Sequence, residues 1–315
     1  MSIYKIADSI VEIKGGAPAK VEMFFRKFLL TDITDFGIPD KCIVRFEHVG
    51  SDEELKAQKE RYLALYSTDE SVFYGIRCRE LTGEWKYHVI RELPLTEGFL
   101  VADKDWKNYV VIDDCRKTGN KSERLLEKNV CRQSTAFDKE NEWIELFLTG
   151  FYSYATLHTI MMIHASAVKY QDKAILFTAP SGTGKTTQAE LWRDFAGAEI
   201  LNGDRVFIKS TGDEERLYAW GSPWAGSSPY IVNDCAEVAA VVVLEQSQEN
   251  ILRKMDVGEA MMQLSSNAFL PMWDARCLEG MLGVMDLVLR KVPVYKLACR
   301  PDEEAVELVR QELFG

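Results

Sequence analysis

The chain has 315 residues, which is enough for one large domain or two ordinary domains with apolar cores. Its formal net charge of −11 argues against a nucleic-acid or anionic-membrane surface, which would need basic patches, but still allows a local basic pocket for a nucleotide. The seven cysteines are scattered, which disfavours zinc and fits a reducing compartment. Without a visible signal peptide or an apolar run of membrane-spanning length, the sequence predicts a cytoplasmic protein.

Residues 1–140 predict a smaller α+β domain, which we expect to serve as an accessory domain that recognises a substrate or partner. A helix over 52–66 follows Ser51 as its N-cap, and Gly83 marks a hairpin turn. Apolar and alternating runs predict strands at 3–13, 41–49, 71–81, 84–93 and 109–114. These residues contain no chemical motif, so their aromatic side chains are interpreted as cross-strand pairs in a half-exposed sheet.

Residues 141–315 predict a second domain of the α/β class, after a composition shift near residue 140. A long apolar helix over 140–162 is expected to join the two domains. Further strands are predicted at 164–170, 173–179, 198–209, 215–223, 237–246 and 293–299. Further helices are predicted at 184–196, 257–269, 274–292 and 302–314.

The stretch FTAPSGTGKTTQAEL, residues 177–191, contains a phosphate-loop pattern, G-x-x-x-x-G-K-[ST], with Ala179 in place of the first glycine. A predicted strand enters the loop and a predicted helix leaves it, which is the context that such a loop needs. Backbone N–H groups and the helix N-terminus would hold β- and γ-phosphates. The candidate nucleotide-binding residues are Ala179, Pro180, Ser181, Gly182, Thr183, Gly184, Lys185, Thr186 and Thr187.

Individual positions of the loop have separate expected roles. Gly182 and Gly184 allow close backbone approach, Lys185 would reach the β/γ oxygens, and the Thr186 hydroxyl would bind Mg²⁺. Ala179 adds only a methyl group at the outer end of the loop, and we expect it to be tolerated if its φ is negative.

Two further residues are candidates for the site. Asp204, in EILNGDRVFI, is placed as an acidic strand-end residue and a second Mg²⁺ ligand; the alternative is a turn residue that pairs with Arg205. His164 is expected at the start of the strand that precedes the loop strand. The spacing alone favours the interpretation of His164 as an ordinary core or surface histidine.

Together, His164, the loop 179–186 and Asp204-Arg205 resemble the catalytic domain of the HPr kinase/phosphorylase family, whose nucleotide fold is similar to that of phosphoenolpyruvate carboxykinase. The resemblance covers roughly residues 160 to 300. It implies a P-loop-containing nucleotide-binding domain that uses ATP and Mg²⁺ to phosphorylate a protein serine, with phosphorolysis as the reverse reaction. It also implies His164, Lys185 and Asp204 as catalytic residues.

This sequence departs from the family at several positions. The glycine-rich stretch E-x-R-G-x-G is replaced by GSPWAG, and residues 1–140 do not resemble the N-terminal domain of the HPr kinases. Gly203 stands where the family has the first of two aspartates, one of which is expected to act as general base. Either His164 has taken over that role, or the chain is a degenerate kinase.

The sequence therefore predicts a Mg-ATP-dependent kinase that transfers the γ-phosphate to a hydroxyl, with serine of a protein or peptide as the favoured acceptor. Two alternatives stay open: a nucleotide-binding regulator with weak or no kinase activity, and a small-molecule kinase. We expect neither a nucleic-acid nor a membrane partner. Homo-oligomerisation and the preference for ATP over GTP stay open.

Overall fold

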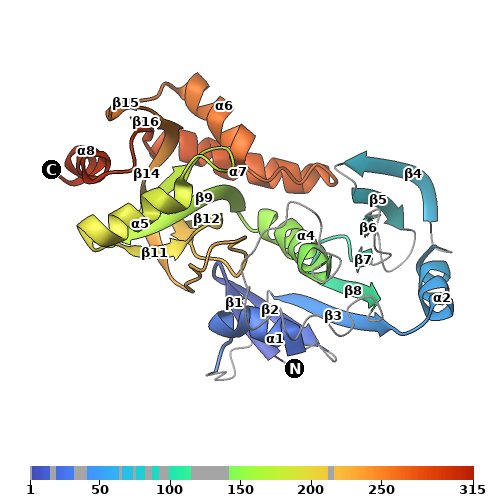
Figure 1. The fold of residues 1–315 in the computed structure, drawn as a ribbon. Helices are drawn as coiled ribbons and strands as arrows, with labels where there is room; N and C mark the ends of the chain where they lie inside the picture. The colour runs from blue at the N-terminus through green and yellow to red at the C-terminus, as the bar shows by residue number, and fades with distance from the viewer. Residues whose placement is uncertain are drawn as a thin grey trace. The chain divides into compact units, whose positions relative to one another are not determined.

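The computed structural model describes residues 2–14, 19–31, 41–63, 66–73, 76–81, 87–91, 99–114, 142–211 and 216–315 (Figure 1). Its contacts divide the chain into two units, one of residues 1–157 with 271–278 and one of residues 158–270 with 279–315. The described residues form seven α-helices and two eight-stranded sheets, which confirms a fold of mixed α and β class. The predicted domain boundary at residue 140 and the predicted turn at Gly83 lie outside the described residues.

The first unit contains one mixed sheet with the strand order β1-β2-β3-β8-β7-β6-β5-β4. Its strands are β1 (Ser2–Ile6), β2 (Ser9–Lys14), β3 (Cys42–Val49), β4 (Tyr66–Phe73), β5 (Ile76–Leu81), β6 (Tyr87–Arg91), β7 (Phe99–Ala102) and β8 (Asn108–Asp114). Its helical segments are α1 (Ala19–Phe25), the short 3-10 helix η1 (Arg26–Phe28), α2 (Asp52–Leu63) and α4 (Glu142–Thr156).

Two predicted strands of this unit are each a pair of antiparallel strands. The run over 3–13 bends between β1 and β2, where Ala7 and Asp8 have φ values of 48° and 62°. Two consecutive residues with positive φ form a tight hairpin turn that matches the twist of the strands. Likewise, the run over 71–81 separates into β4 and β5, in which Phe73 faces Ile76. The prediction of single strands was wrong, because the first run continues through the turn at Ala7 and Asp8 and the second run consists of two strands that pair with each other.

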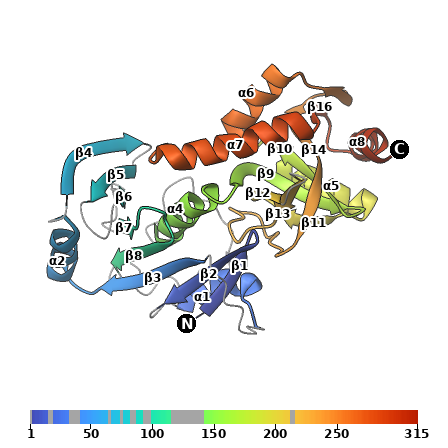
Figure 2. The ribbon, with the colours of Figure 1, turned by 180° about the vertical axis from the view of Figure 1, so that it is seen from behind.

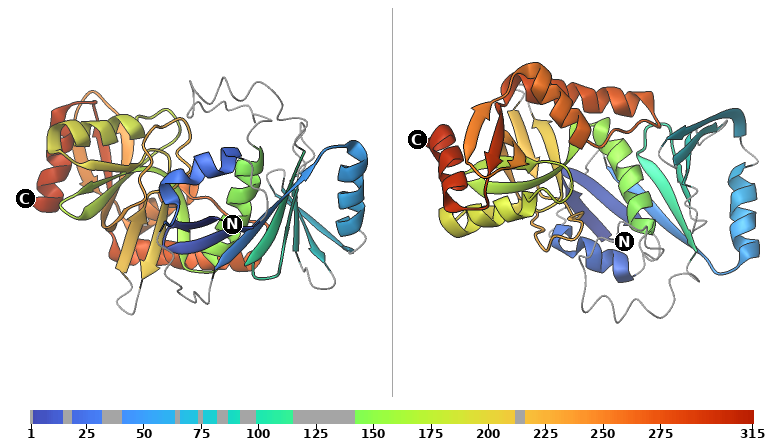
Figure 3. Two further views of the ribbon diagram at one scale, coloured as in Figure 1. Left: turned by 90° about the horizontal axis from the view of Figure 1, so that it is seen from below. Right: turned by 45° about the horizontal axis from the view of Figure 1, so that its top comes forward.

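The apolar helix α4 packs on this sheet, along β7 and β8 (Figure 3). The Phe147 ring contacts Tyr109 edge-on, and the Tyr109 hydroxyl donates to the Phe147 carbonyl at 3.1 Å. The helix ends at Thr156, so the prediction of a helix over 140–162 was wrong at its end. Residues 160–162 instead begin a strand, after Thr159 with a φ of 58°.

A short segment from late in the chain, residues 271–278, belongs to this first unit. The Trp106 indole donates to Asp274 Oδ2 at 3.0 Å, and the Trp273 indole donates to Ser153 Oγ at 2.9 Å. Trp106 is fully buried, so the carboxylate of Asp274 satisfies an indole N–H that water does not reach.

The second unit contains the glycine-rich loop. Its strands are β9 (Ile160–Tyr170), β10 (Lys173–Thr178), β11 (Glu199–Asn202), β12 (Arg205–Thr211), β13 (Arg216–Trp220), β14 (Cys235–Gln246), β15 (Ile251–Lys254) and β16 (Val294–Cys299). Its helices are α5 (Lys185–Ala196), α6 (Val257–Asn267), α8 (Glu303–Phe314) and most of α7 (Ala275–Lys291).

Strand β10 is central to this unit, because it pairs with β9 on one side and with β14 on the other. Its residues from Ala174 onward are buried, as expected of a strand covered on both faces. Helices α5 and α8 pack beside each other against the strands (Figures 1 and 2). Trp192 of α5 lies against Phe177 of β10 in this core. The buried strand and the helix that packs on it therefore fix both ends of the loop between them.

Candidate functional site

The loop between β10 and α5 presents a row of backbone N–H groups without acceptors. Gly182 and Gly184 have φ values of 82° and 112°, which L-residues rarely adopt. Within the described residues, the N–H groups of Gly182, Gly184 and residues 185–187 donate to no protein acceptor, whereas Gln188 begins the helical pattern by donating to the Gly184 carbonyl. Free N–H groups at the start of a helix form an anion-binding site.

Ala179, at the first position of the loop, faces the core of the second unit. Its side chain is fully buried in the cluster that also contains Phe177 and Trp192. It is absent from the residues with positive φ, so the condition under which alanine should be tolerated is met. The methyl group therefore packs in this core.

The ammonium group of Lys185 is buried beneath the loop, with only 7% of the residue exposed. Its Nζ donates to the carbonyls of Ala179 at 2.9 Å and Pro180 at 3.3 Å. Burial lowers the pKa of Lys185, and the negative charge of Asp204 partly opposes this shift. A buried cation held by two neutral carbonyls is an incomplete ion pair, which an anion in the loop would complete.

Thr186, the next residue, connects the helix to the chain turn at residues 202–204. Its Oγ1 donates to the Gly203 carbonyl at 3.3 Å. At this turn the Asn202 Oδ1 accepts from the N–H groups of Asp204 at 2.8 Å and Arg205 at 2.9 Å. The predicted strand over 198–209 is therefore two strands, β11 and β12, because the Asn202 side chain stabilises a turn between them.

Asp204 lies on this turn with both carboxylate oxygens engaged. His164 Nδ1 lies 3.1 Å from Oδ1, and Arg205 Nε lies 3.6 Å from Oδ2. Burial raises the pKa of Asp204, but the His164 hydrogen bond and the charges of Arg205 and Lys185 outweigh it, so the pKa is lowered overall. Asp204 therefore favours the ionised state that a cation site requires.

His164 lies within β9, not at the start of that strand as predicted. It sits opposite Arg205 in the antiparallel register of β9 and β12, which brings it to the Asp204 turn. Its side chain is 24% exposed, so part of the imidazole remains accessible to solvent. The structure brings His164, Thr186 and Asp204 to one place beside the loop.

The segment that follows β13 supports this turn. The Ser222 hydroxyl donates to the Arg205 carbonyl at 2.6 Å, and Asn202 Nδ2 donates to the Ser222 carbonyl at 2.9 Å. Ser228 fills the space beside Gly203: a Cβ added at Gly203 would lie 1.8 Å from Ser228 Oγ and 2.4 Å from Ser228 Cβ. The sequence pattern does not single out Asn202, Ser222 or Ser228, although the Asn-Gly pair at 202–203 is a turn signal.

The oxygen ligands present are those that Mg²⁺ uses beside phosphates. Among the described residues, no group of three or more His, Cys, Asp or Glu side chains could hold a metal ion alone. Mg²⁺ usually takes one or two protein ligands and completes its shell with phosphate and water oxygens. Thr186 of α5, whose hydroxyl donates to the Gly203 carbonyl, and Asp204, the next residue of that turn, are two side chains with oxygen atoms of this kind.

No α-helix in the described ranges is both long and apolar enough to cross a membrane.

Comparison with known proteins finds similarity at the level of solved structures. No protein-family model and no curated protein matches the chain. A structure of the Hpr(Ser) kinase/phosphatase from Coxiella burnetii is similar over 49% of this chain and 99% of its own, with 14% identity and a TM-score of 0.30.

The packing of Gly203 against Ser228 leads to a stability prediction. We expect Gly203→Ala to lower the free energy of unfolding by about 1–3 kcal/mol, because the added methyl overlaps Ser228. Thermal denaturation measures the loss, and Gly203→Ala combined with Ser228→Gly should recover part of it. Gly283→Ala in α7 is the matched control, since its added Cβ meets no atom within 4 Å. Equal melting temperatures for Gly203→Ala and Gly283→Ala would contradict this packing.

Proposed function

We propose that the chain binds Mg-ATP and transfers its γ-phosphate to a hydroxyl group, with serine of a protein or peptide as the favoured acceptor. The supporting observation is the combination of free loop N–H groups with the buried Lys185 ammonium, which together form a site for a polyphosphate. Phosphoryl transfer depends mainly on positioning and charge neutralisation, and these groups supply both.

Mg²⁺ would bind at Thr186 and Asp204, where it neutralises phosphate charge. The Thr186 hydroxyl is at the start of α5, and the Asp204 carboxylate is held on the adjoining turn. The lowered pKa of Asp204 keeps this ligand ionised at neutral pH. Lys185 would contact phosphate oxygens in place of one of its present carbonyl partners.

His164 is the candidate general base. When Nδ1 carries a proton, it donates to Asp204 Oδ1, and this leaves Nε2 free to accept the proton of an attacking hydroxyl. The Asp204 carboxylate would then orient the imidazole, as in other His–Asp pairs. Gly203 carries no carboxylate, so within the predicted motif His164 is the group suited to this role.

A second candidate function is a nucleotide-binding regulator with weak or no kinase activity. Two observations favour it: Ser228 occupies the space beside Gly203, and Asp204 is engaged by both His164 and Arg205. The loop would then bind a nucleotide without rapid transfer. In either case we propose that the first unit recognises the acceptor or partner, and that the protein acts in the cytoplasm.

Lys185→Ala tests the phosphate site. We expect wild-type protein to bind Mg-ATP with a micromolar to millimolar Kd (~−4 to −8 kcal/mol). The variant should lose on the order of 1.5–3 kcal/mol, because a charge-assisted contact disappears. Isothermal titration calorimetry measures both. Lys173→Ala, at the opposite end of β10 and paired with Glu237, is the control for loss of one positive charge. Equal binding by wild type and Lys185→Ala would rule out this loop as the nucleotide site.

Asp204→Asn tests the metal ligand. The substitution keeps the shape of the side chain and removes the charge that favours Mg²⁺. We expect Mg²⁺ to strengthen ATP binding to wild type but not to the variant, while metal-free binding changes little. Titrations with and without Mg²⁺ measure this difference, with Asp234→Asn as the control. If Mg²⁺ still strengthens binding to Asp204→Asn, Asp204 is only a turn residue that pairs with Arg205.

His164→Ala separates transfer from binding. With γ-phosphate-labelled ATP and a panel of serine-containing peptides, we expect transfer to fall by about 10²–10⁴, the usual contribution of a general base. Calorimetry should show nearly unchanged ATP binding, and His158→Ala serves as the histidine control. Full transfer by His164→Ala would refute its role as base. An almost inert wild type that still binds ATP would favour the regulator.

A further inference from the structure

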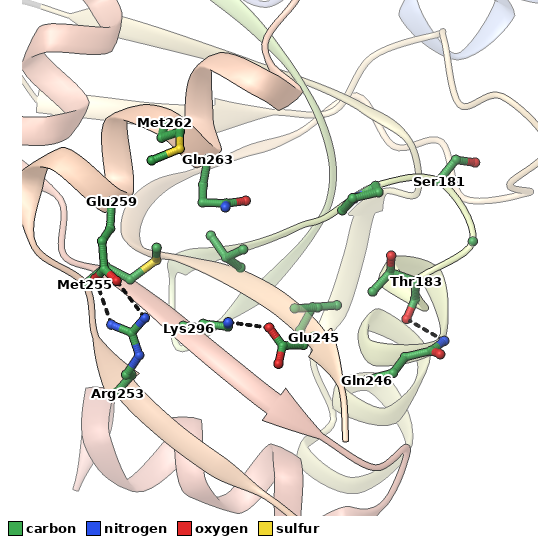
Figure 4. A pocket seen from close by; sticks show the side chains of 14 residues that line it. Ser181, Thr183, Glu245, Gln246, Arg253, Met255, Glu259, Met262, Gln263 and Lys296 are labelled. Atoms are coloured by element: carbon green, nitrogen blue, oxygen red, sulfur yellow. Dashed lines mark hydrogen bonds and ion pairs between the residues drawn. The ribbon is translucent and has the colours of Figure 1, made fainter. Parts of the chain in front are cut away.

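A cavity of about 620 Å³ opens beside the tip of the phosphate loop, within the second unit (Figure 4). The loop residues 180–183 form one wall, and residues 243–246 at the end of β14 form another. The remaining lining comes from β15, α6 and β16 and includes Arg253, Met255, Glu259, Met262, Gln263 and Lys296. Its size falls in the range of ordinary small-molecule sites, which is roughly 300–1,000 Å³.

The cavity and the His164–Asp204 pair lie on different sides of the loop strand. In the sheet, β10 has β9, which carries His164, as one neighbour and β14, which lines the cavity, as the other. The Gln246 side chain of β14 donates to the Thr183 carbonyl of the loop at 3.4 Å. A polyphosphate in the loop with its terminal phosphate near Asp204 would therefore direct its other end toward the cavity.

The charges around the cavity are already paired. Arg253 makes two hydrogen bonds of 2.8 Å to the Glu259 carboxylate, and Lys296 is paired with Glu245. The two basic and two acidic side chains cancel, so the cavity offers no net attraction to a second anionic group. An uncharged group with apolar faces and polar edges suits this lining best.

Three side chains of the lining, Met255, Met262 and Gln263, are suited to contact such a group. Met262 is 65% exposed although it is large and apolar, and Met255 also lines the cavity. Figure 4 shows the Gln263 side chain pointing into the cavity, and its amide makes no hydrogen bond within the described part of the chain. An amide offers both a donor and an acceptor, and methionine packs well against flat rings.

We propose that this cavity binds the nucleoside part of the nucleotide, with the base packed against Met255 and Met262 and hydrogen-bonded by Gln263. The inference rests on the proposed function, because the loop must first hold the phosphates. It adds a base-recognition site to the phosphate site and assigns a role to α6, which carries no recognisable motif.

The test compares ATP with inorganic tripolyphosphate, which has the phosphates but no nucleoside. We expect wild type to bind ATP more tightly than tripolyphosphate. Met262→Ala and Gln263→Ala should each weaken ATP binding on the order of tenfold, because contacts with the base are lost, and should leave tripolyphosphate binding unchanged. Met261→Ala is the matched control: its side chain is 54% exposed on the same helix but does not line the cavity. Lys185→Ala should weaken binding of both ligands.

The outcomes separate the two hypotheses. Equal binding of ATP and tripolyphosphate by wild type would refute the proposed nucleoside site and leave the phosphate site intact. The same conclusion follows if Met262→Ala and Gln263→Ala bind ATP as wild type does. Equal weakening of both ligands in these variants would also overturn it, since base contacts affect ATP alone. If wild type binds neither ligand, the proposed function fails, and the inference fails with it.

Discussion

The candidate phosphate site depends on one buried positive charge, the ammonium group of Lys185. Lys185 is enclosed below the loop, where its ammonium contacts two carbonyls of its own loop, and no described carboxylate forms an ion pair with it. A charge in such a position is costly unless an opposite charge lies near it. Asp204 supplies a negative charge near Lys185. Each of these two groups favours the charged form of the other, which reduces the free-energy cost of burying both charges. The open N–H groups above the ammonium complete a site that favours an anion.

The turn at residues 202–204 connects the elements that surround the Lys185 ammonium group. Hydrogen bonds reach it from α5 through Thr186, from the 221–228 segment through Ser222, and from β9 through His164. The Asn202 side chain holds the turn from within. A carboxylate fixed from several directions has little freedom to move when its partners change, which suits a charged group that must keep one position.

Within the second unit, the side chains on the two sides of the loop strand differ in chemistry. Histidine, carboxylate and guanidinium groups gather where β9 pairs with β12, whereas methionine, glutamine and paired charges line the cavity beyond β14. Strand β10 lies between these neighbours and carries the loop at its end, which is the arrangement that the proposed nucleotide site requires. The helix α5 behind the loop stabilises this arrangement through its buried face.

The sequence by itself determined the features that depend on residues close together along the chain. The loop, the strand that enters it and the helix that leaves it form a local pattern, and the strong apolar runs located most strands. Local patterns failed where a tight turn interrupts an apolar run, as at Asn202, and where an apolar helix passes directly into a strand, as before Ile160. Only the tertiary structure decided that Ser228 fills the space beside Gly203, that His164 meets Asp204, and that residues 180–183, 243–246 and 262–263 enclose one cavity. Such contacts depend on strand register and packing between distant segments, which no local pattern encodes.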